Sequence, residues 1–194
     1  MRNDSPIIEV RELVKNFGEF CAVNRIFFEV PRGEIFGFLG PNGAGKTTTI
    51  NILCTLSLPT SGKALVNSFD VVRQRSKVRR SIGLVFQDLT LDEYLTGEQN
   101  LNFHAYAYGV PRAVRHKRVR YLLELVELWE RRRQKVREYS GGMKRRLEIA
   151  RGLLHWPRVL FLDEPTLGLD PQSRRLVWEH ILSLRGQENL TIFL

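Results

Sequence analysis

Apolar and polar residues follow two alternating patterns along the chain, one typical of strands and one typical of helices. Short apolar or alternating runs predict strands at residues 7–13, 22–30, 33–40, 63–69, 81–87, 158–165 and 189–194. Longer runs, several of them bounded by glycine or proline, predict helices at residues 46–57, 71–80, 96–109, 111–128, 141–155 and 171–186. Strands that alternate with helices predict an α/β fold with a mainly parallel sheet.

The segment from about 90 to 150 differs because it is almost wholly helical, and we interpret it as a helical subdomain inserted into the α/β core. Within it, Leu122, Leu125, Val126 and Trp129 recur at steps of three and four residues. This spacing predicts an apolar stripe along one helix. The whole chain, residues 1–194, is therefore expected to form a single domain with this insertion.

The net charge of +9 is unevenly placed along the chain. Residues 110–151 hold 14 of the 30 lysines and arginines but 5 of the 21 acidic residues, so this segment carries the whole excess. Nucleic acid, an anionic membrane surface or solubility would each explain a local basic excess. We favour the simplest interpretation, which is that these are solvated helix faces.

Composition favours a globular protein of the cytoplasm. Hydrophobic residues make up 43% of the chain and charged residues 26%, as in ordinary soluble domains. No apolar stretch approaches the roughly 20 residues that cross a bilayer, and the N-terminus lacks the apolar region of a signal peptide. Cys21 and Cys54 are too few for a disulfide framework, and we expect both to be packed thiols.

The segment "GPNGAGKT", residues 40–47, has the spacing of a phosphate-binding loop. An apolar strand precedes it and a helix follows it, as the mechanism requires. Glycines let the backbone wrap round phosphate oxygens, Lys46 reaches the β- and γ-phosphates, and Thr47 offers its hydroxyl to Mg²⁺. The loop therefore predicts a binding site for a magnesium nucleotide.

Two acidic residues follow the apolar strand "VLFL". Asp163 stands where a carboxylate meets the metal, directly or through water. Side chains alternate along a strand, so Glu164 points elsewhere and suits a second role, the general base that orients and polarises the attacking water.

A second glycine loop, in "YSGGMKRRLEIARGLL" at residues 139–154, opens a strongly helical run. Free N–H groups and the helix dipole at such a start favour an anion, so Ser140, Gly141 and Gly142 form a second candidate phosphate site.

Together these motifs resemble the ATP-binding cassette (ABC) ATPase domain, over about residues 7–194. The segment "YSGGMKRR" resembles the family signature LSGGQ, "VFQD" resembles the Q-loop with Gln87, and "LDEPTLGLD" resembles the Walker B strand and the D-loop with Asp170. The motifs are more specifically similar to those of daunorubicin-resistance-like multidrug exporters. The resemblance implies a P-loop NTPase core with N-terminal antiparallel strands and an inserted helical subdomain.

The resemblance also implies why there are two phosphate loops. In this family two cassettes pair head to tail, and each ATP lies between the first loop of one and the signature of the other. The implied partners are therefore ATP with Mg²⁺ and a second ABC cassette, identical or related. The implied ATP-binding residues are Phe17, Val23, Gly40, Pro41, Asn42, Gly43, Ala44, Gly45, Lys46, Thr47, Thr48, Ser140, Gly141, Gly142 and Asp170. The implied metal-binding residues are Thr47, Gln87 and Asp163, and the implied catalytic residues are Glu164, Lys46 and Gln87.

Some positions depart from the commonest family pattern. Tyr139 stands where Leu is usual and Met143 where Gln is common, although both changes leave the Ser-Gly-Gly donors in place. Phe17 matches the aromatic position that stacks on adenine, where Tyr is frequent, with core packing as the alternative. Val23 is expected to touch the base as well.

Exporter cassettes of this group couple ATP to a separate integral membrane permease, which implies a location on the cytoplasmic face of the cell membrane. Gln87 and the helical segment 92–109 would contact the permease, together with Leu89, Leu91, Tyr94 and Leu95, for which core packing is the alternative. The rival interpretations are the ATPase of an uptake system and a soluble ABC ATPase that acts on ribosomes or DNA. The ribosome type has two cassettes in one chain, and the DNA type has a long coiled coil between the first loop and the signature. This chain has one cassette, and Lys46 and Ser140 are only 94 positions apart, so we expect no nucleic-acid partner.

The chain ends within the predicted strand 189–194. In the family this strand leads to a switch histidine that contacts the γ-phosphate. None of the four histidines, His104, His116, His155 and His180, follows the strand. We therefore expect a domain truncated at its C-terminus, which binds Mg²⁺-ATP but hydrolyses it poorly.

Overall fold

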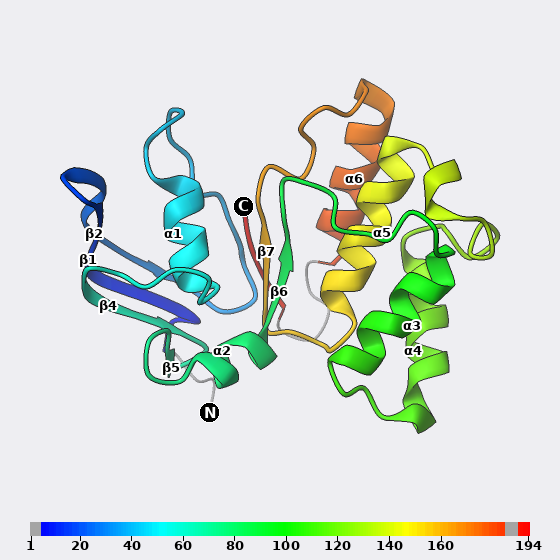
Figure 1. The fold of residues 1–194 in the computed structure, drawn as a ribbon, viewed down its shortest axis with the longest axis horizontal. Helices are drawn as coiled ribbons and strands as arrows, with labels where there is room; N and C mark the ends of the chain where they lie inside the picture. Colours follow the sequence, from blue (N-terminus) through cyan, green and yellow to red (C-terminus); the bar gives the residue numbers. More distant parts are fainter. Residues whose placement is uncertain (1–4, 185–189) are drawn as a thin grey trace. The chain divides into compact units, whose positions relative to one another are not determined.

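The computed structural model describes residues 5–184 and 190–194, and the chain divides into two compact units. The first unit contains residues 5–84, 158–163 and 190–194, and the second contains residues 85–157 and 164–184. Figure 1 shows two sheets in the first unit and a group of helices in the second.

An antiparallel sheet forms the N-terminal part of the first unit, with strand order β2-β1-β4-β5. Its strands are β1 (Ile8–Phe17), β2 (Phe20–Val30), β4 (Ser61–Val66) and β5 (Phe69–Asp70). β1 and β2 form a hairpin that turns at Gly18 and Glu19, where Gly18 has a φ of 59° that glycine adopts without steric cost. The implied N-terminal antiparallel strands are confirmed.

The second sheet is built round parallel strands, in the order β3-β8-β7-β6. Its strands are β3 (Ile35–Phe36), β6 (Ile82–Val85), β7 (Val159–Leu162) and β8 (Thr191–Phe193). All four residues of β7 are buried, which explains why its apolar run does not alternate. The predicted strand 33–40 is regular over two residues only, although Phe38 N still donates to Leu194 O at 2.7 Å.

One hydrophobic core joins the two sheets to helices α1 (Lys46–Leu53) and α2 (Arg75–Ser81). The partly buried rings of Phe28, Phe36 and Phe38 pack against the buried rings of Phe161 and Phe193, with the centroids of neighbouring rings 5.2–6.1 Å apart. The first phosphate loop follows the half-buried strand β3 and leads into α1, which packs on this core.

The second unit is helical, as the segment from 90 to 150 predicts. Its elements are α3 (Gly97–Ala107), α4 (Arg112–Leu125), the short 3₁₀ helix η1 (Val136–Glu138), α5 (Gly141–Leu153) and α6 (Pro171–Ser183). α5 packs against α3, α4 and α6 and is the central helix of the unit (Figure 1). The part of the predicted helix 171–186 beyond Leu184, and residue 189 of the predicted last strand, lie outside the described residues.

The apolar stripe lies on α4, slightly displaced from its predicted position. Leu122 and Val126 are buried as predicted, whereas Leu125 and Trp129 are half-buried at its edge. Leu123, which the spacing did not select, is fully buried. The helix ends at Leu125, three residues before its predicted end, and Val126 and the residues that follow pack as a turn.

The basic excess of residues 110–151 is partly used inside the second unit. Four of its arginines donate to main-chain carbonyls: Arg115 to Val110, Arg118 to Leu154, Arg132 to Trp129 and Arg146 to Val126, at 2.9–3.0 Å. Others, such as Arg112, Lys117 and Arg133, lie on exposed faces as predicted. The excess is therefore not one free cationic surface.

Two predictions about composition have different outcomes. Cys54 is fully buried, and burial together with the negative charge of Asp163 raises the pKa of its thiol well above the usual value. Cys21 is exposed, so the prediction that it is packed is wrong; it lies on β2, an edge strand of its sheet. Within residues 5–184 and 190–194, every helix is too short or too polar to cross a membrane.

Candidate functional site

The first phosphate loop, residues 40–47, depends on one glycine that no other residue replaces. Gly45 is the N-cap of α1 with φ 82° and ψ 13°. A Cβ there would lie 2.2 Å from the carbonyl oxygen of Ala22 on β2. The loop therefore passes directly against β2 and opens α1 at Lys46.

Contacts inside this loop close it on itself. The ammonium group of Lys46 donates to the carbonyls of Gly40 at 2.7 Å and Pro41 at 2.9 Å. Thr47 is exposed in the first turn of α1, Thr48 is half-buried, and Asn42 is exposed in the loop. Lys46 is thus held over the loop, and the hydroxyl-bearing Thr47 is open to a ligand.

A hollow of about 270 Å³ lies beside the loop. Its lining combines β2 with the loop and consists of Cys21, Ala22, Val23, Asn24, Ile26, Phe38, Gly43, Ala44 and Thr49. Val23, which is 4% exposed, lines it as a fixed apolar wall. Phe17 is 54% exposed, with the Lys15 ammonium 4.7 Å from its ring centroid. Core packing, the alternative for Phe17, is therefore excluded.

The two acidic residues after β7 fall in different units. Asp163 is half-buried in the first unit, where its charge acts on Cys54. Glu164 begins the second unit and is exposed, with a φ of 47° that non-glycine residues adopt at a cost. The left-handed backbone conformation thus begins at the predicted base, directly after the predicted metal ligand.

The signature loop opens α5 in the second unit. Ser140 caps the helix, with its Oγ accepting from Met143 N at 3.3 Å. Gly141 is exposed, whereas Gly142 is buried, and a Cβ on it would lie 2.6 Å from Ser173 Oγ. Ser140 and Gly141 are open to a ligand, and Gly142 is required by the close approach of α6.

Tyr139, which departs from the family pattern, is accommodated by a glycine on α3. A Cβ on Gly97 would lie 2.5 Å from the Tyr139 hydroxyl oxygen. That hydroxyl donates to Arg131 O at 2.8 Å, and burial raises its pKa. The larger side chain is therefore part of the packing beneath the signature loop.

Asp170 has a local role in addition to the one the resemblance implies. It is the N-cap of α6 and accepts from Ser173 N at 3.0 Å. Hydrogen bonds from the side chain and backbone of Ser173 lower the pKa of Asp170, so it stays ionised at a helix N-terminus.

Sequence reasoning did not select Arg145, although the structure gives it four contacts with the candidate site. It is 3% exposed on α5 and donates to carbonyls at Phe86, Gln87, Glu164 and Pro165. In the sequence it is one of three consecutive basic residues on a helix, which gave no signal that this one is buried.

The segment after Gln87 is also fixed by α5. Glu148, which is fully buried, accepts from Thr90 N at 2.7 Å and from Arg151 Nη2 at 2.6 Å. Gln87 itself is exposed. Of the residues predicted to meet a permease, Leu89 and Tyr94 are exposed and Leu91 and Leu95 are half-buried.

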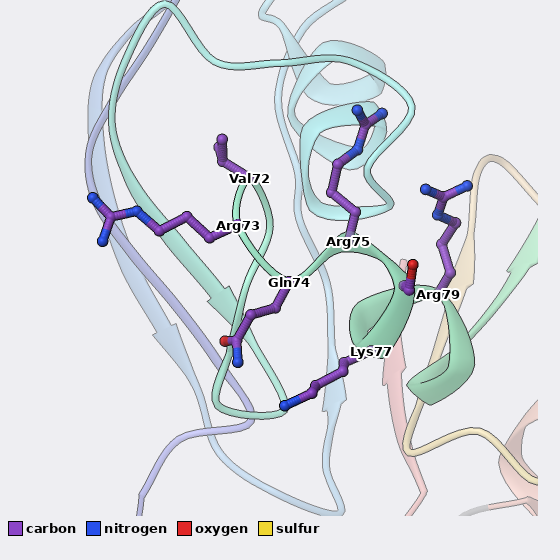
Figure 2. Close-up of a pocket in the computed structure, with 7 residues that line it drawn as sticks. Val72, Arg73, Gln74, Arg75, Lys77 and Arg79 are labelled. Atoms are coloured by element: carbon purple, nitrogen blue, oxygen red, sulfur yellow. The ribbon is translucent and has the colours of Figure 1, made fainter.

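A second hollow, of about 420 Å³, lies at the start of α2 in the first unit (Figure 2). Arg75 and Arg79 point to one side of it, whereas Arg73 and Lys77 point away from them. Arg75 donates to Thr55 O at 2.8 Å, and Lys77 lies over a phenylalanine ring. These cations do not converge on one point, so we assign no ligand to this hollow.

The four histidines occupy positions outside the predicted site. His155 stacks on Tyr108 with centroids 4.2 Å apart, and the His180 ring contacts Leu176 O at 2.6 Å. Burial, with the charge of Arg151, lowers the pKa of His104 to about 4.

Comparison with known proteins gives the family. The sequence profile described as "ABC transporter" matches residues 23–167, which include the first phosphate loop, Gln87, the signature loop and Asp163. The chain belongs to the ABC transporter family. The fold agrees, because CbiO1 from Clostridium perfringens, described as part of the ABC transporter complex CbiONQ, superposes with a TM-score of 0.89 at 31% identity. That match covers 98% of this chain and 78% of CbiO1.

Two relatives resemble this ABC chain over most of its length. The doxorubicin resistance ATP-binding protein DrrA of Mycobacterium tuberculosis is 44% identical over 187 residues. The probable multidrug ABC transporter ATP-binding protein YbhF of Escherichia coli is 44% identical over 178 residues. The matches cover 95% and 92% of this chain, but 56% and 31% of the relatives. The resemblance to drug-resistance cassettes and the α/β fold class of an ABC ATPase are confirmed.

Proposed function

We propose that this ABC chain is the ATP-binding and hydrolysing subunit of an exporter that works with a separate membrane permease. The observation that carries the proposal is the pair of helix starts, one at each phosphate loop. Lys46 opens α1 behind Gly45, and Gly141 opens α5 behind Ser140. Each start presents N–H groups and a positive helix end to an anion.

The residues of the first unit fit a magnesium nucleotide. Lys46 supplies a cation over the loop, Thr47 supplies an exposed hydroxyl, and Asp163 supplies a partly exposed carboxylate in the same unit. Bound Mg²⁺ would neutralise charge that develops on the phosphate oxygens. The hollow lined by Val23 takes the nucleoside, with the exposed Phe17 ring as its stacking partner.

The residues of the second unit would carry the proton and the partner contacts. Glu164 is exposed and accepts the proton of the attacking water, which Gln87 helps to orient. Ser140 and Gly141 would bind the γ-phosphate held by a second cassette. Such an arrangement needs two copies, or one copy and a related cassette.

The names of the relatives support export rather than uptake. DrrA and YbhF are described by drug resistance and multidrug transport, whereas CbiO1 belongs to a complex described as CbiONQ. The proposal includes a location on the cytoplasmic face of the membrane, and the exposed side chains of Leu89 and Tyr94 are available there for contact with a permease.

The proposal is tested by trapping the ATP-bound dimer. Glu164→Gln keeps the shape of the side chain but removes the base, so we expect slow hydrolysis and a dimer in size-exclusion chromatography with ATP and Mg²⁺. Lys46→Ala, the matched control, removes the cation that faces the phosphates and is expected to abolish both turnover and the ATP-dependent dimer. A Glu164→Gln protein that stays monomeric and hydrolyses ATP at the normal rate would refute the assignment.

The partner class is tested separately. A tagged protein expressed in its own cells is expected to co-purify with an integral membrane protein after mild detergent extraction. Retention on ribosomes or DNA instead would favour a soluble ABC ATPase.

A further inference from the structure

Arg145 connects one helix to two distant segments of the candidate site. Its Nη1 donates to Phe86 O at 2.5 Å and its Nη2 to Gln87 O at 3.2 Å. The same guanidinium donates from Nη2 to Glu164 O at 3.1 Å and from Nε to Pro165 O at 2.7 Å. All five residues lie in the second unit, so these contacts belong to one compact body.

The chemistry of the side chain suits this position. Burying a guanidinium is unfavourable unless its donors are satisfied, and here three of its nitrogens meet carbonyl oxygens. The planar fork holds its N–H groups at fixed angles, so it fixes the carbonyls relative to one another. Lysine has one nitrogen on a flexible stem and cannot reach the same set of carbonyls together.

The backbone that Arg145 holds at Glu164 is strained. Glu164 has a φ of 47°, and its carbonyl also accepts from Leu167 N at 3.1 Å. Such conformations persist where surrounding contacts over-determine them, and they aim a side chain in a direction that relaxed backbone does not allow. The Glu164 side chain is exposed in this conformation.

We propose that Arg145 is a positioning residue that fixes the backbone of Gln87 and Glu164 together from the signature helix. The roles of Gln87 and Glu164 rest on the proposed function, whereas the fixed backbone does not. Glu148 and Arg151, further along α5, hold Thr90 at the other end of the Gln87 segment. Helix α5 thus fixes the segment from Gln87 to Thr90 at both ends. Of the three α5 side chains, Arg145 is the one that also holds the second segment, at Glu164.

The first measurement is independent of ATP turnover. Hydrogen exchange of the wild type is compared with that of Arg145→Met, which keeps an apolar stem of similar length. We expect at least about tenfold faster exchange for amides at 86–90 and 164–168, with the first phosphate loop unchanged. Unchanged exchange in both segments would overturn the proposal.

Arg146→Met is the matched control. Arg146 is the next residue on α5 and is half-buried, but it donates to Val126 O and Glu127 and contacts neither segment. We expect its exchange effect to be confined to the neighbourhood of Val126. If both variants loosen 86–90 and 164–168 equally, the effect is general destabilisation and the proposal fails.

The second measurement separates positioning from binding. We expect Arg145→Met to lower kcat on the order of 100-fold with KM for ATP changed less than about threefold, because a displacement near 1 Å costs about that much. Arg145→Lys is expected to recover only a small part of the kcat that Arg145→Met loses. In a Glu164→Gln background the Arg145 change should add little, since the same step is already lost. If the loss of kcat in the double variant equalled the product of the losses in the two single variants, Arg145 would not act through Glu164.

Loss of the proposed function would look different. A wild type without ATP turnover, but with the expected exchange changes in Arg145→Met, would refute the ATPase assignment and leave the positioning role in place.

Discussion

The first phosphate loop and the two segments beside the signature helix, at Gln87 and at Glu164, are held in different ways. In the first loop the closing contacts are local, since Lys46 bonds to Gly40 and Pro41, five or six residues away. The segments at Gln87 and Glu164, beside the signature helix, are held by Arg145 over 58 and 19 residues of sequence. A loop closed by its own residues shows its contacts in a local motif, whereas the motifs at Gln87 and Glu164 do not show which distant side chain holds them.

One residue contradicts a purely local account of the first loop. Gly45 is required because β2 passes beside it, with Ala22 O at 2.2 Å from any added Cβ. The glycine of the motif is therefore required by a tertiary contact as well as by its local conformation.

The largest effect is expected for Gly45→Ala. An alanine with φ 82° is strained, and its Cβ collides with a backbone carbonyl that cannot move aside without shifting β2. We expect a loss of at least about 2 kcal/mol in the free energy of unfolding, measured by urea titration. Gly43→Ala is the control, because Gly43 has a similar φ of 81° but no atom within 4 Å of an added Cβ. Equal losses for the two variants would mean that β2 imposes nothing on the loop.

An intermediate effect is expected for Gly142→Ala in the signature loop. The added Cβ would lie 2.6 Å from Ser173 Oγ and 2.8 Å from Ser173 Cβ, so we expect a loss of about 1–3 kcal/mol in the free energy of unfolding. Gly141→Ala, one residue earlier, meets only Leu169 at 3.5 Å and is expected to be neutral or to stabilise the helix by up to about 1 kcal/mol. The comparison fails if Gly141→Ala is the more destabilising of the two.

The smallest effect concerns His104 in the helical unit. Its pKa is about 4 in the folded protein against 6.5 for an unperturbed histidine, so the unfolded chain binds more protons between these values. Stability should therefore fall as the pH drops from about 6.5 towards 4. Solvent screening of a half-exposed ring keeps this below about 1 kcal/mol. In His104→Gln the urea midpoint should depend less steeply on pH over that range. If the pH dependence of the midpoint is unchanged, it arises from groups other than His104.

The sequence predicted most elements because their signals are local. The helix that begins at Lys46 follows glycines, and α6 begins at Pro171 behind the capping residue Asp170. The errors occurred where tertiary contacts decide. Cys21 is exposed whereas Val23 on the same strand is buried, and the predicted strand 33–40 is regular over two residues only.

The candidate site divides in the same way. Glycine spacing and a lysine at a helix start were sufficient to predict the loop at residues 40–47, and the Ser-Gly-Gly sequence was sufficient to predict the loop that opens α5. Arg145 was not, because three basic residues in a row on a helix differ only in the face they occupy. Tyr139 was seen as a departure, but its partner Gly97 lies 42 positions away and became visible only through the 2.5 Å contact.

By itself, the sequence predicted which short segments bind phosphate and where their helices start, since a positive φ, a helix start and a cation at fixed spacing are properties of neighbouring residues. Only the tertiary structure decided what holds the groups around them. The burial of Arg145 among four carbonyls, the strained backbone of Glu164 and the approach of α6 to Gly142 depend on helices packing against distant segments. Packing selects one side chain among several chemically equal ones, and no local pattern of residues records that choice.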